Sequence, residues 1–141
     1  MIKDKNKISQ IIDFTGLGRS KIYPTDIDAV LEFDNKFLII IEVKYKGVKQ
    51  PLGQQILLHR LADCWQTVNQ EAFVINCEHE THSSKIINLY NTTVVSVYHK
   101  KIKHKVNSKL YELLKKIAKH YKITKLIKSL TNDKRISKSG Y

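Results

Sequence analysis

Hydrophobic and polar residues alternate in two runs within residues 23–47, on either side of the polar tripeptide DNK at residues 34–36. Alternation with a period of two is typical of β-strands, and a short polar segment between two such runs predicts a β-hairpin. If the loop has three residues, Phe33 lies opposite Phe37 in the paired strands. The rest of the chain is expected to pack around this hairpin.

The same register determines which charged residues meet at the far end of the hairpin. Counting back from the turn pairs Leu31 with Ile39 and Asp28 with Glu42. Directly opposed residues have Cβ atoms about 4.5 to 5.5 Å apart, so the two carboxylates would be close enough to bind one cation. Lys44 shares the face of Glu42 because side chains two positions apart on a strand point the same way. The hairpin therefore predicts a site made of two carboxylates and an amine.

The remaining pattern predicts helices and strands that follow one another around this hairpin. A helical spacing of apolar residues predicts one helix before the hairpin and another after it. Runs rich in apolar and β-branched residues predict two further strands, separated by a short element. This order is typical of a mixed α/β sheet with helices on its faces. The expected helices span residues 5–14 and 53–67, the strands span 72–77 and 92–98, and the short element lies near 85–90.

The last predicted element is a long, basic, amphipathic helix. It begins at Asn107 or Ser108, which are both good N-cap residues, and runs to about Leu130. Leucine, isoleucine and tyrosine recur at spacings near three and four, and lysines fill the other side. We expect a single domain, with a core over residues 1–106 and the basic helix and its tail over 107–141.

Length and composition narrow the class of protein. The chain has 141 residues, of which 42% are hydrophobic and 27% charged, so one globular domain is expected. No apolar run approaches the roughly 18 to 20 residues that span a bilayer, and the first residues lack the apolar core of a signal peptide. Two cysteines, Cys64 and Cys77, are too few for a disulfide scaffold. These features favour a cytoplasmic protein with reduced thiols.

Positive charge is concentrated at one end of the chain. The formal net charge is +12, yet residues 1–99 hold 11 basic and 11 acidic side chains, whereas residues 100–141 hold 14 and 2. A basic segment on a neutral body predicts a polyanionic partner, either nucleic acid or an anionic membrane surface. The alternative is that the lysines form only the solvated face of a packed helix. We expect DNA and no membrane, with backbone phosphates bound by Lys100, Lys101, Lys103, Lys115, Lys116, Lys119 and Lys122.

The residues at the end of the hairpin are those that phosphodiester hydrolysis requires. The reaction needs a deprotonated water, a polarised phosphorus and stabilisation of the leaving oxyanion, and a carboxylate-bound Mg²⁺ can assist all three. Mg²⁺ prefers oxygen ligands and keeps several waters, so the carboxylates of Asp28 and Glu42 and the carbonyl of Val43 would suffice. Lys44 would orient or activate the attacking water, or balance charge on the phosphate.

The order and spacing of these residues resemble the PD-(D/E)xK nuclease superfamily. Asp28 is followed by Glu42-Val43-Lys44 at the end of an apolar strand, as the family's Asp is followed by its ExK triplet. The resemblance covers about residues 1–98. It implies a restriction-endonuclease-like fold, Mg²⁺ with Mn²⁺ as a possible substitute, and endonuclease activity on DNA. It also implies that Asp28 and Glu42 bind the metal and that Lys44 is the catalytic lysine.

Neighbouring residues strengthen the resemblance. The segment TDID at residues 25–28 is similar to the form seen in small phage and bacterial members, with isoleucine in place of the family's proline. Gln54, at the start of the next helix, is similar to a glutamine that assists catalysis in several subfamilies. Asp26 is open as a rival or helper of the aspartate that follows it, and Asp4 or Asp13 as an acidic residue from the first helix.

Three questions stay open at the level of sequence. Family relatives include junction resolvases, so branched or junction DNA is one candidate substrate, and a resolvase would need a symmetric homodimer. A non-catalytic nucleic-acid-binding protein on the same fold is the alternative to an enzyme. Cys77, His79 and His82 form a loose set that could bind Zn²⁺, although the spacing fits no common zinc module.

Overall fold

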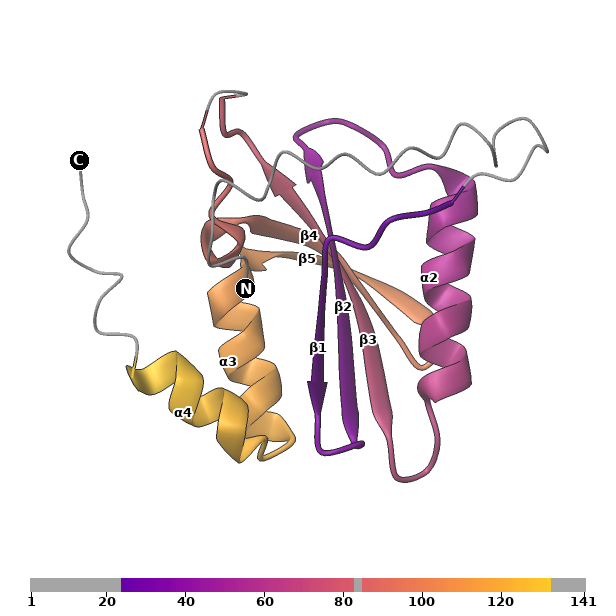
Figure 1. Cartoon of the computed structure of the whole chain (residues 1–141), viewed down its shortest axis with the longest axis vertical. Helices are drawn as coiled ribbons and strands as arrows, with labels where there is room; N and C mark the ends of the chain where they lie inside the picture. The colour runs from indigo at the N-terminus through magenta and orange to yellow at the C-terminus, as the bar shows by residue number, and fades with distance from the viewer. Residues whose placement is uncertain (1–23, 83–84, 133–141) are drawn as a thin grey trace.

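A computed structural model describes residues 24–82 and 85–132 of the chain. Within these residues the fold is α/β, with one five-stranded sheet and helices on both of its faces (Figure 1). The helix expected over residues 5–14, together with Asp4 and Asp13, lies outside the described residues. The elements in chain order are β1 (Ala29–Phe33), β2 (Phe37–Tyr45), α2 (Leu52–Trp65), β3 (Glu71–His79), the 3₁₀ helix η2 (Leu89–Asn91), β4 (Thr93–His99), β5 (Ile102–Lys109), α3 (Leu110–His120) and α4 (Thr124–Asn132).

The sheet is mixed, as the sequence predicts, and its strands lie in the order in which the chain forms them. β2 and β3 are parallel and are joined through α2, whereas every other neighbouring pair is antiparallel. A parallel pair needs a crossover and cover on both faces, which explains why the middle of both strands is an unbroken apolar run. The expected helix over 53–67 and the strands over 72–77 and 92–98 are confirmed as α2, β3 and β4.

The predicted hairpin is confirmed together with its register. Phe33 pairs with Phe37 and Leu31 with Ile39 across β1 and β2. The turn places Asp34 and Asn35 in the left-handed region, each with φ of 54°, which these two residue types tolerate better than most. Because the register is correct, the polar end of β2 lies where the sequence predicts it.

Alternate residues of the central strands pack on different helices. Ile40 and Val74 face α2 and contact Leu58 and Ala62. Their neighbours on the same strands, such as Ile39, Ile41, Phe73 and Ile75, face α3 and α4. Figure 1 shows the result, with α2 on one side of the sheet and α3 and α4 on the other. A residue's position in β2 therefore decides which helix layer it meets.

The prediction that a long helix begins at Asn107 or Ser108 is wrong. Both residues lie in β5, which pairs antiparallel with β4 through a two-residue turn at Lys100 and Lys101. Most side chains of β5 are exposed, so the strand lacks the apolar alternation by which strands are recognised. Lysines along an edge strand are a common protection against pairing with another chain. The boundary at residue 106 therefore falls inside a strand.

The long helix is also interrupted at its middle. α3 ends at His120 and α4 begins at Thr124, and Lys122 between them has a φ of 55°. The N–H of Ile123 donates to the carbonyl of Ala118, five residues earlier, at 2.9 Å. This pattern is a Schellman motif, which glycine usually completes, so a lysine in the left-handed position gave no signal in the sequence.

None of the described helices is long and apolar enough to cross a bilayer.

Candidate active site

Glu42 is a buried charged residue at the end of the apolar run of β2. Its side chain is only 2% exposed. It lies two residues after Ile40, on the face of β2 that α2 covers, and it pairs with Asn76 of β3. A carboxylate withdrawn from water needs hydrogen-bonding partners or a cation to offset the loss of hydration.

Gln54 supplies one of these partners from the first turn of α2. Its Nε2 donates to Oε1 of Glu42 at 2.7 Å and to the backbone carbonyl of Asp26 at 3.2 Å. Gln54 is itself buried, at 7% exposed. The glutamine selected from the sequence therefore contacts the glutamate directly and also fixes the segment that leads into β1.

Lys44 supplies the second partner. Its Nζ lies 2.5 Å from the same oxygen, Oε1 of Glu42. The hydrogen bond to Glu42 is the main reason why the pKa of Lys44 is raised; partial burial opposes the shift, and the charges of Glu42, Asp28 and Asp26 reinforce it. Lys44 is therefore protonated at neutral pH.

Asp28, the residue immediately before β1, lies close to the same part of β2. The last paired residues of the hairpin are Ala29 and Ile41, and Oδ2 of Asp28 accepts a hydrogen bond from the N–H of Val43 at 2.7 Å. The Asp28 carboxylate thus lies against the peptide unit that joins Glu42 to Val43. The exposed Asp28 is thereby held by the residue that follows the buried Glu42; its direct pairing with Glu42 stays a prediction, because the paired residues end at Ala29 and Ile41.

One oxygen of Glu42 still lacks a partner. Gln54 and Lys44 both bind Oε1, whereas Oε2 is buried without a hydrogen-bond partner in the described part of the chain. Carboxylate oxygens are the ligands that Mg²⁺ prefers, and the ion keeps several waters. No group of three or more His, Cys, Asp or Glu side chains able to hold a metal is found among the described residues. Asp28 and Glu42 are the carboxylates that the described residues offer here, and one or two carboxylates are the number that Mg²⁺ commonly uses.

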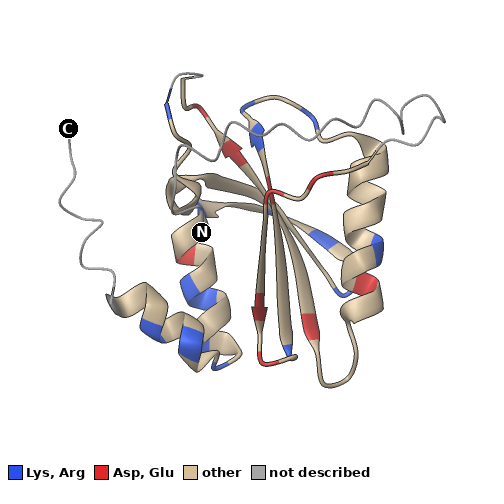
Figure 2. Cartoon of the chain, in the orientation of Figure 1, with Lys and Arg blue, Asp and Glu red and all other residues tan. Residues whose placement is uncertain are grey.

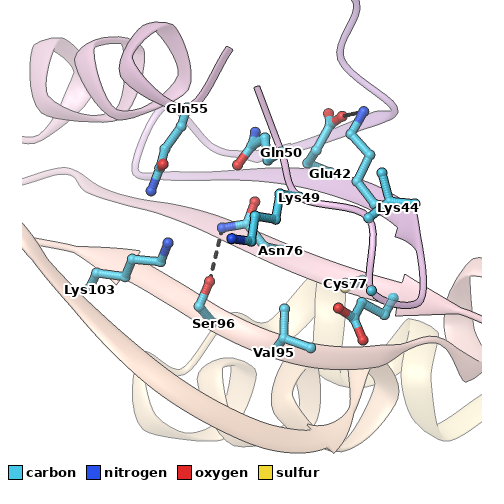
Figure 3. Close-up of a pocket in the computed structure, with 13 residues that line it drawn as sticks. Glu42, Lys44, Lys49, Gln50, Gln55, Asn76, Cys77, Val95, Ser96 and Lys103 are labelled. Carbon is cyan, nitrogen blue, oxygen red and sulfur yellow. Dashed lines mark hydrogen bonds and ion pairs between the residues drawn. The ribbon is translucent and has the colours of Figure 1, made fainter. Parts of the chain in front are cut away.

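A cavity of about 350 Å³ adjoins the carboxylate cluster (Figure 3). Its floor comes from the strands β2, β3 and β4, and its walls come from the loop after β2, the start of α2 and β5. Its lining is mainly polar and contains several amides and lysines. The polar lining consists of Glu42, Lys44, Lys49, Gln50, Gln55, Asn76, Glu78, Ser96 and Lys103.

The lysines expected to bind DNA are divided between different parts of the molecule. Lys103 lines the cavity next to Glu42. Lys100 forms an ion pair with Glu71, at the other end of the sheet, and Lys101 follows it in the β4–β5 turn. The remaining four are exposed in or just after α3, on the side of the sheet opposite α2, as Figure 2 shows for the basic residues of α3 and α4. These four are Lys115, Lys116, Lys119 and Lys122.

The zinc set suggested by the sequence is not assembled. Cys77 is buried in the core on the α3 side of the sheet, and burial raises the pKa of its thiol to about 11. His79 accepts a hydrogen bond from the N–H of Thr81 through Nδ1, and its ring contacts Tyr45 edge-on. Both cysteines are free thiols, with Cys64 exposed.

Asn76, Ser96 and Gln50 are cavity residues that sequence reasoning missed. Asn76 is the one polar residue within an apolar strand, at residues 72–77, and this signal could have drawn attention to it. Ser96 and Gln50 carry no comparable signal, because their place beside the glutamate depends on sheet pairing and on the loop after β2.

No family model, curated protein or solved structure matches this chain.

Proposed function

We propose that this chain is a Mg²⁺-dependent endonuclease that hydrolyses phosphodiester bonds in DNA, on a restriction-endonuclease-like fold of the PD-(D/E)xK type. One observation carries the proposal. Gln54 and Lys44 both bind Oε1 of Glu42, its buried Oε2 has no partner in the described part of the chain, and the Asp28 carboxylate is held by the N–H of the next residue, Val43. This arrangement holds a carboxylate in one orientation with one oxygen available for a cation.

In this proposal the carboxylates of Asp28 and Glu42 and the carbonyl of Val43 hold the ion. When bound, Mg²⁺ lowers the pKa of a water and offsets negative charge on the phosphate; Mn²⁺ is expected to substitute for it. Gln54 keeps the glutamate in place from α2, and its second hydrogen bond keeps the approach to β1 in register. Asp26 supports Lys44 electrostatically and is not itself a proposed ligand.

The protonation state of Lys44 limits the role that it can take. Its pKa is raised by the hydrogen bond to Glu42, so in this ion pair Lys44 already carries a proton and is not arranged to accept one from water. A protonated amine next to the scissile phosphate instead balances charge on a non-bridging oxygen, which is greatest in the transition state. We therefore assign charge stabilisation to Lys44 and not general-base catalysis.

The test is cleavage of supercoiled, linear and branched DNA in the presence of Mg²⁺, compared with the same reactions in EDTA. Glu42→Gln and Lys44→Ala should each lower the rate by at least about a hundredfold, the loss typical when one charge-stabilising group is removed. The exposed Asn69, in the loop between α2 and β3, gives the matched control Asn69→Ala, which should cut as fast as the wild type. Equal rates for the wild type and Glu42→Gln would sink the proposal.

The same experiment separates the remaining alternatives. A protein that binds DNA but cuts none of these substrates would be the non-catalytic binding protein. Preferential cutting of a four-way junction by a homodimer would make the enzyme a resolvase, because two symmetric cuts need two sites. A monomer that prefers other DNA would exclude that version. Oligomeric state should therefore be measured by sedimentation at the concentrations used for cleavage.

A further inference from the structure

We propose that the cavity beside Glu42 binds one unpaired nucleobase of the substrate. The enzyme would therefore act on DNA in which a nucleotide next to the cut bond is unpaired. This inference rests on the proposed nuclease function and names a class of substrate for it. The residues that carry it are Gln50, Asn76, Val95 and Ser96, which we call the base cavity.

The location of the base cavity couples it to the carboxylates. Glu42, Asn76 and Ser96 occupy directly paired positions on β2, β3 and β4, so they form one polar row across the sheet. Glu42 and Lys44 line the same cavity. A group bound over Asn76 is therefore next to the proposed reaction centre, within the reach of one nucleotide.

Two unpartnered atoms belong to residues that line the base cavity, and they indicate what kind of group fits. Nε2 of Gln50, a donor, and Oδ1 of Asn76, an acceptor, are both buried without hydrogen-bond partners in the described part of the chain. The Asn76 amide is held by its other end, because Nδ2 donates to Oγ of Ser96 at 3.0 Å (Figure 3). A buried donor and a buried acceptor each need a partner, or the cost of removing them from water is not recovered.

A phosphate cannot satisfy both atoms. Phosphate oxygens only accept hydrogen bonds at neutral pH, so a phosphate would leave the Asn76 carbonyl unpaired. The edge of a nucleobase offers donors and acceptors side by side, and asparagine and glutamine are the side chains that match such an edge. The amides therefore favour a base over a backbone phosphate. The exposed Lys49 and Lys103 at the rim of the same cavity are suited to the flanking phosphates.

A β-bulge adds an apolar surface to the base cavity. The pairing of β3 with β4 shifts by one residue after Asn76, and Val95 is the extra residue on β4. Consecutive residues normally point to opposite faces of a sheet, yet Val95 and Ser96 both line the cavity because of this bulge. An apolar side chain beside hydrogen-bonding amides suits the flat face and the polar edge of one base.

Burial explains why the base must be unpaired. Ser96 is 5% exposed, and the unpartnered amide atoms are buried with it, so a base within a duplex cannot reach them. A base extruded from a helix, or already single-stranded, can enter such a pocket and present its pairing edge. The volume of about 350 Å³ lies at the small end of the range for ligand sites, which fits a single base and its sugar.

The test measures binding without cleavage and then cleavage on the same DNA. A duplex with one unpaired nucleotide is compared by fluorescence anisotropy, in EDTA, with a duplex that has an abasic unit at the same position. The wild type should bind the intact base about tenfold more tightly, the preference expected for one stacked and hydrogen-bonded base. Gln50→Ala and Asn76→Ala should each reduce the preference to about threefold or less, whereas Asn69→Ala should retain it.

The outcomes separate this inference from the proposed function. Equal binding of the two DNAs by the wild type overturns the base cavity, even if both DNAs are cut in Mg²⁺. A retained preference without any cleavage overturns the nuclease and leaves the cavity in place. Cleavage should map to a bond that flanks the unpaired nucleotide. Gln50 lies in a loop, so Gln50→Ala keeps the test valid if Asn76→Ala does not fold.

Discussion

The side-chain amide of Gln54 donates to the carboxylate of Glu42 at 2.7 Å, joining the first turn of α2 to the end of β2. Both side chains are almost fully buried. Gln54 therefore acts in two ways, because the same hydrogen bond stabilises the fold and fixes the orientation of the glutamate. The first prediction separates these two effects.

Gln54→Ala should destabilise the protein by about 2 kcal/mol, since a buried hydrogen bond to a charged group is lost. Activity measured well below the melting temperature should also fall, because Glu42 is no longer held from the α2 side. Chemical denaturation gives the first quantity and DNA cleavage the second. Gln55→Ala, on the next and less buried residue, is the control for stability, with an expected loss of less than about 1 kcal/mol. An unchanged rate for Gln54→Ala would show that the amide is only structural.

Mg²⁺ should raise the melting temperature of the wild type and not that of Glu42→Gln. At a Mg²⁺ concentration about tenfold above the dissociation constant, binding stabilises the native state by about 1.4 kcal/mol, which corresponds to a shift of a few degrees. Glu42→Gln keeps the shape of the side chain and removes the charge that holds the ion. Differential scanning calorimetry with and without Mg²⁺ measures both proteins. Equal shifts in the two proteins would place the ion elsewhere.

The ion pair of Lys44 with Glu42 should stabilise the protein in neutral and mildly alkaline solution and weaken at high pH. The folded-state pKa of Lys44 lies above its ordinary value of 10.5, so its contribution is complete below that pH and is lost as pH rises through the folded-state value. The difference in unfolding free energy between the wild type and Lys44→Met should be constant from pH 7 to 9 and shrink above 10.5. Urea titrations over this range would measure it, and a difference independent of pH would contradict the pairing.

The two cysteines should differ in reactivity. Cys64 is exposed, whereas Cys77 is buried and its pKa is raised to about 11 by that burial. At pH 8 a thiol reagent should modify one cysteine rapidly in the native protein and the second only after unfolding, because the thiolate is the reactive form. Cys64→Ser should abolish the rapid phase. A second rapid phase in the native protein would mean that Cys77 is not in the core.

Salt dependence can show which lysines bind the DNA backbone. Each phosphate contact that is lost lowers the slope of log affinity against log salt by about 0.9. If α3 binds phosphates as the sequence predicts, neutralising Lys115, Lys116, Lys119 and Lys122 together should lower the slope by about 3 to 4. Lys103→Gln, at the rim of the cavity that Glu42 also lines, should lower it by about 1. An unchanged slope for the quadruple variant would assign these four to a solvated surface in and just after α3.

The hairpin could be predicted in detail because local and long-range signals agree there. Strand alternation and a polar turn at residues 34–36 specify the register, and Asp28, just before the first paired residue, accepts a hydrogen bond from Val43, the residue after Glu42. Gln54 could be selected only through the family resemblance, and the structure shows that it contacts Glu42.

The C-terminal third could not be predicted in the same way. β5 is an exposed edge strand that pairs with β4 through a turn at Lys100 and Lys101. Two lysines are not among the residue pairs that predict a two-residue hairpin turn. The break between α3 and α4 depends on Lys122 in a conformation that usually needs glycine. In both places tertiary contacts outweigh the local preference of the residues.

The mixed sheet divides the proposed chemistry from the proposed choice of substrate. The residues of the proposed reaction centre all lie in the segment from the residue before β1 to the first turn of α2. They are Asp28, Glu42, Lys44 and Gln54. Ser96 and Lys103, in contrast, reach the cavity from the antiparallel hairpin of β4 and β5. If the chain is the proposed nuclease, mutations in that hairpin would alter which DNA is accepted while the carboxylates stay in place. Its specificity could then change without loss of the proposed activity.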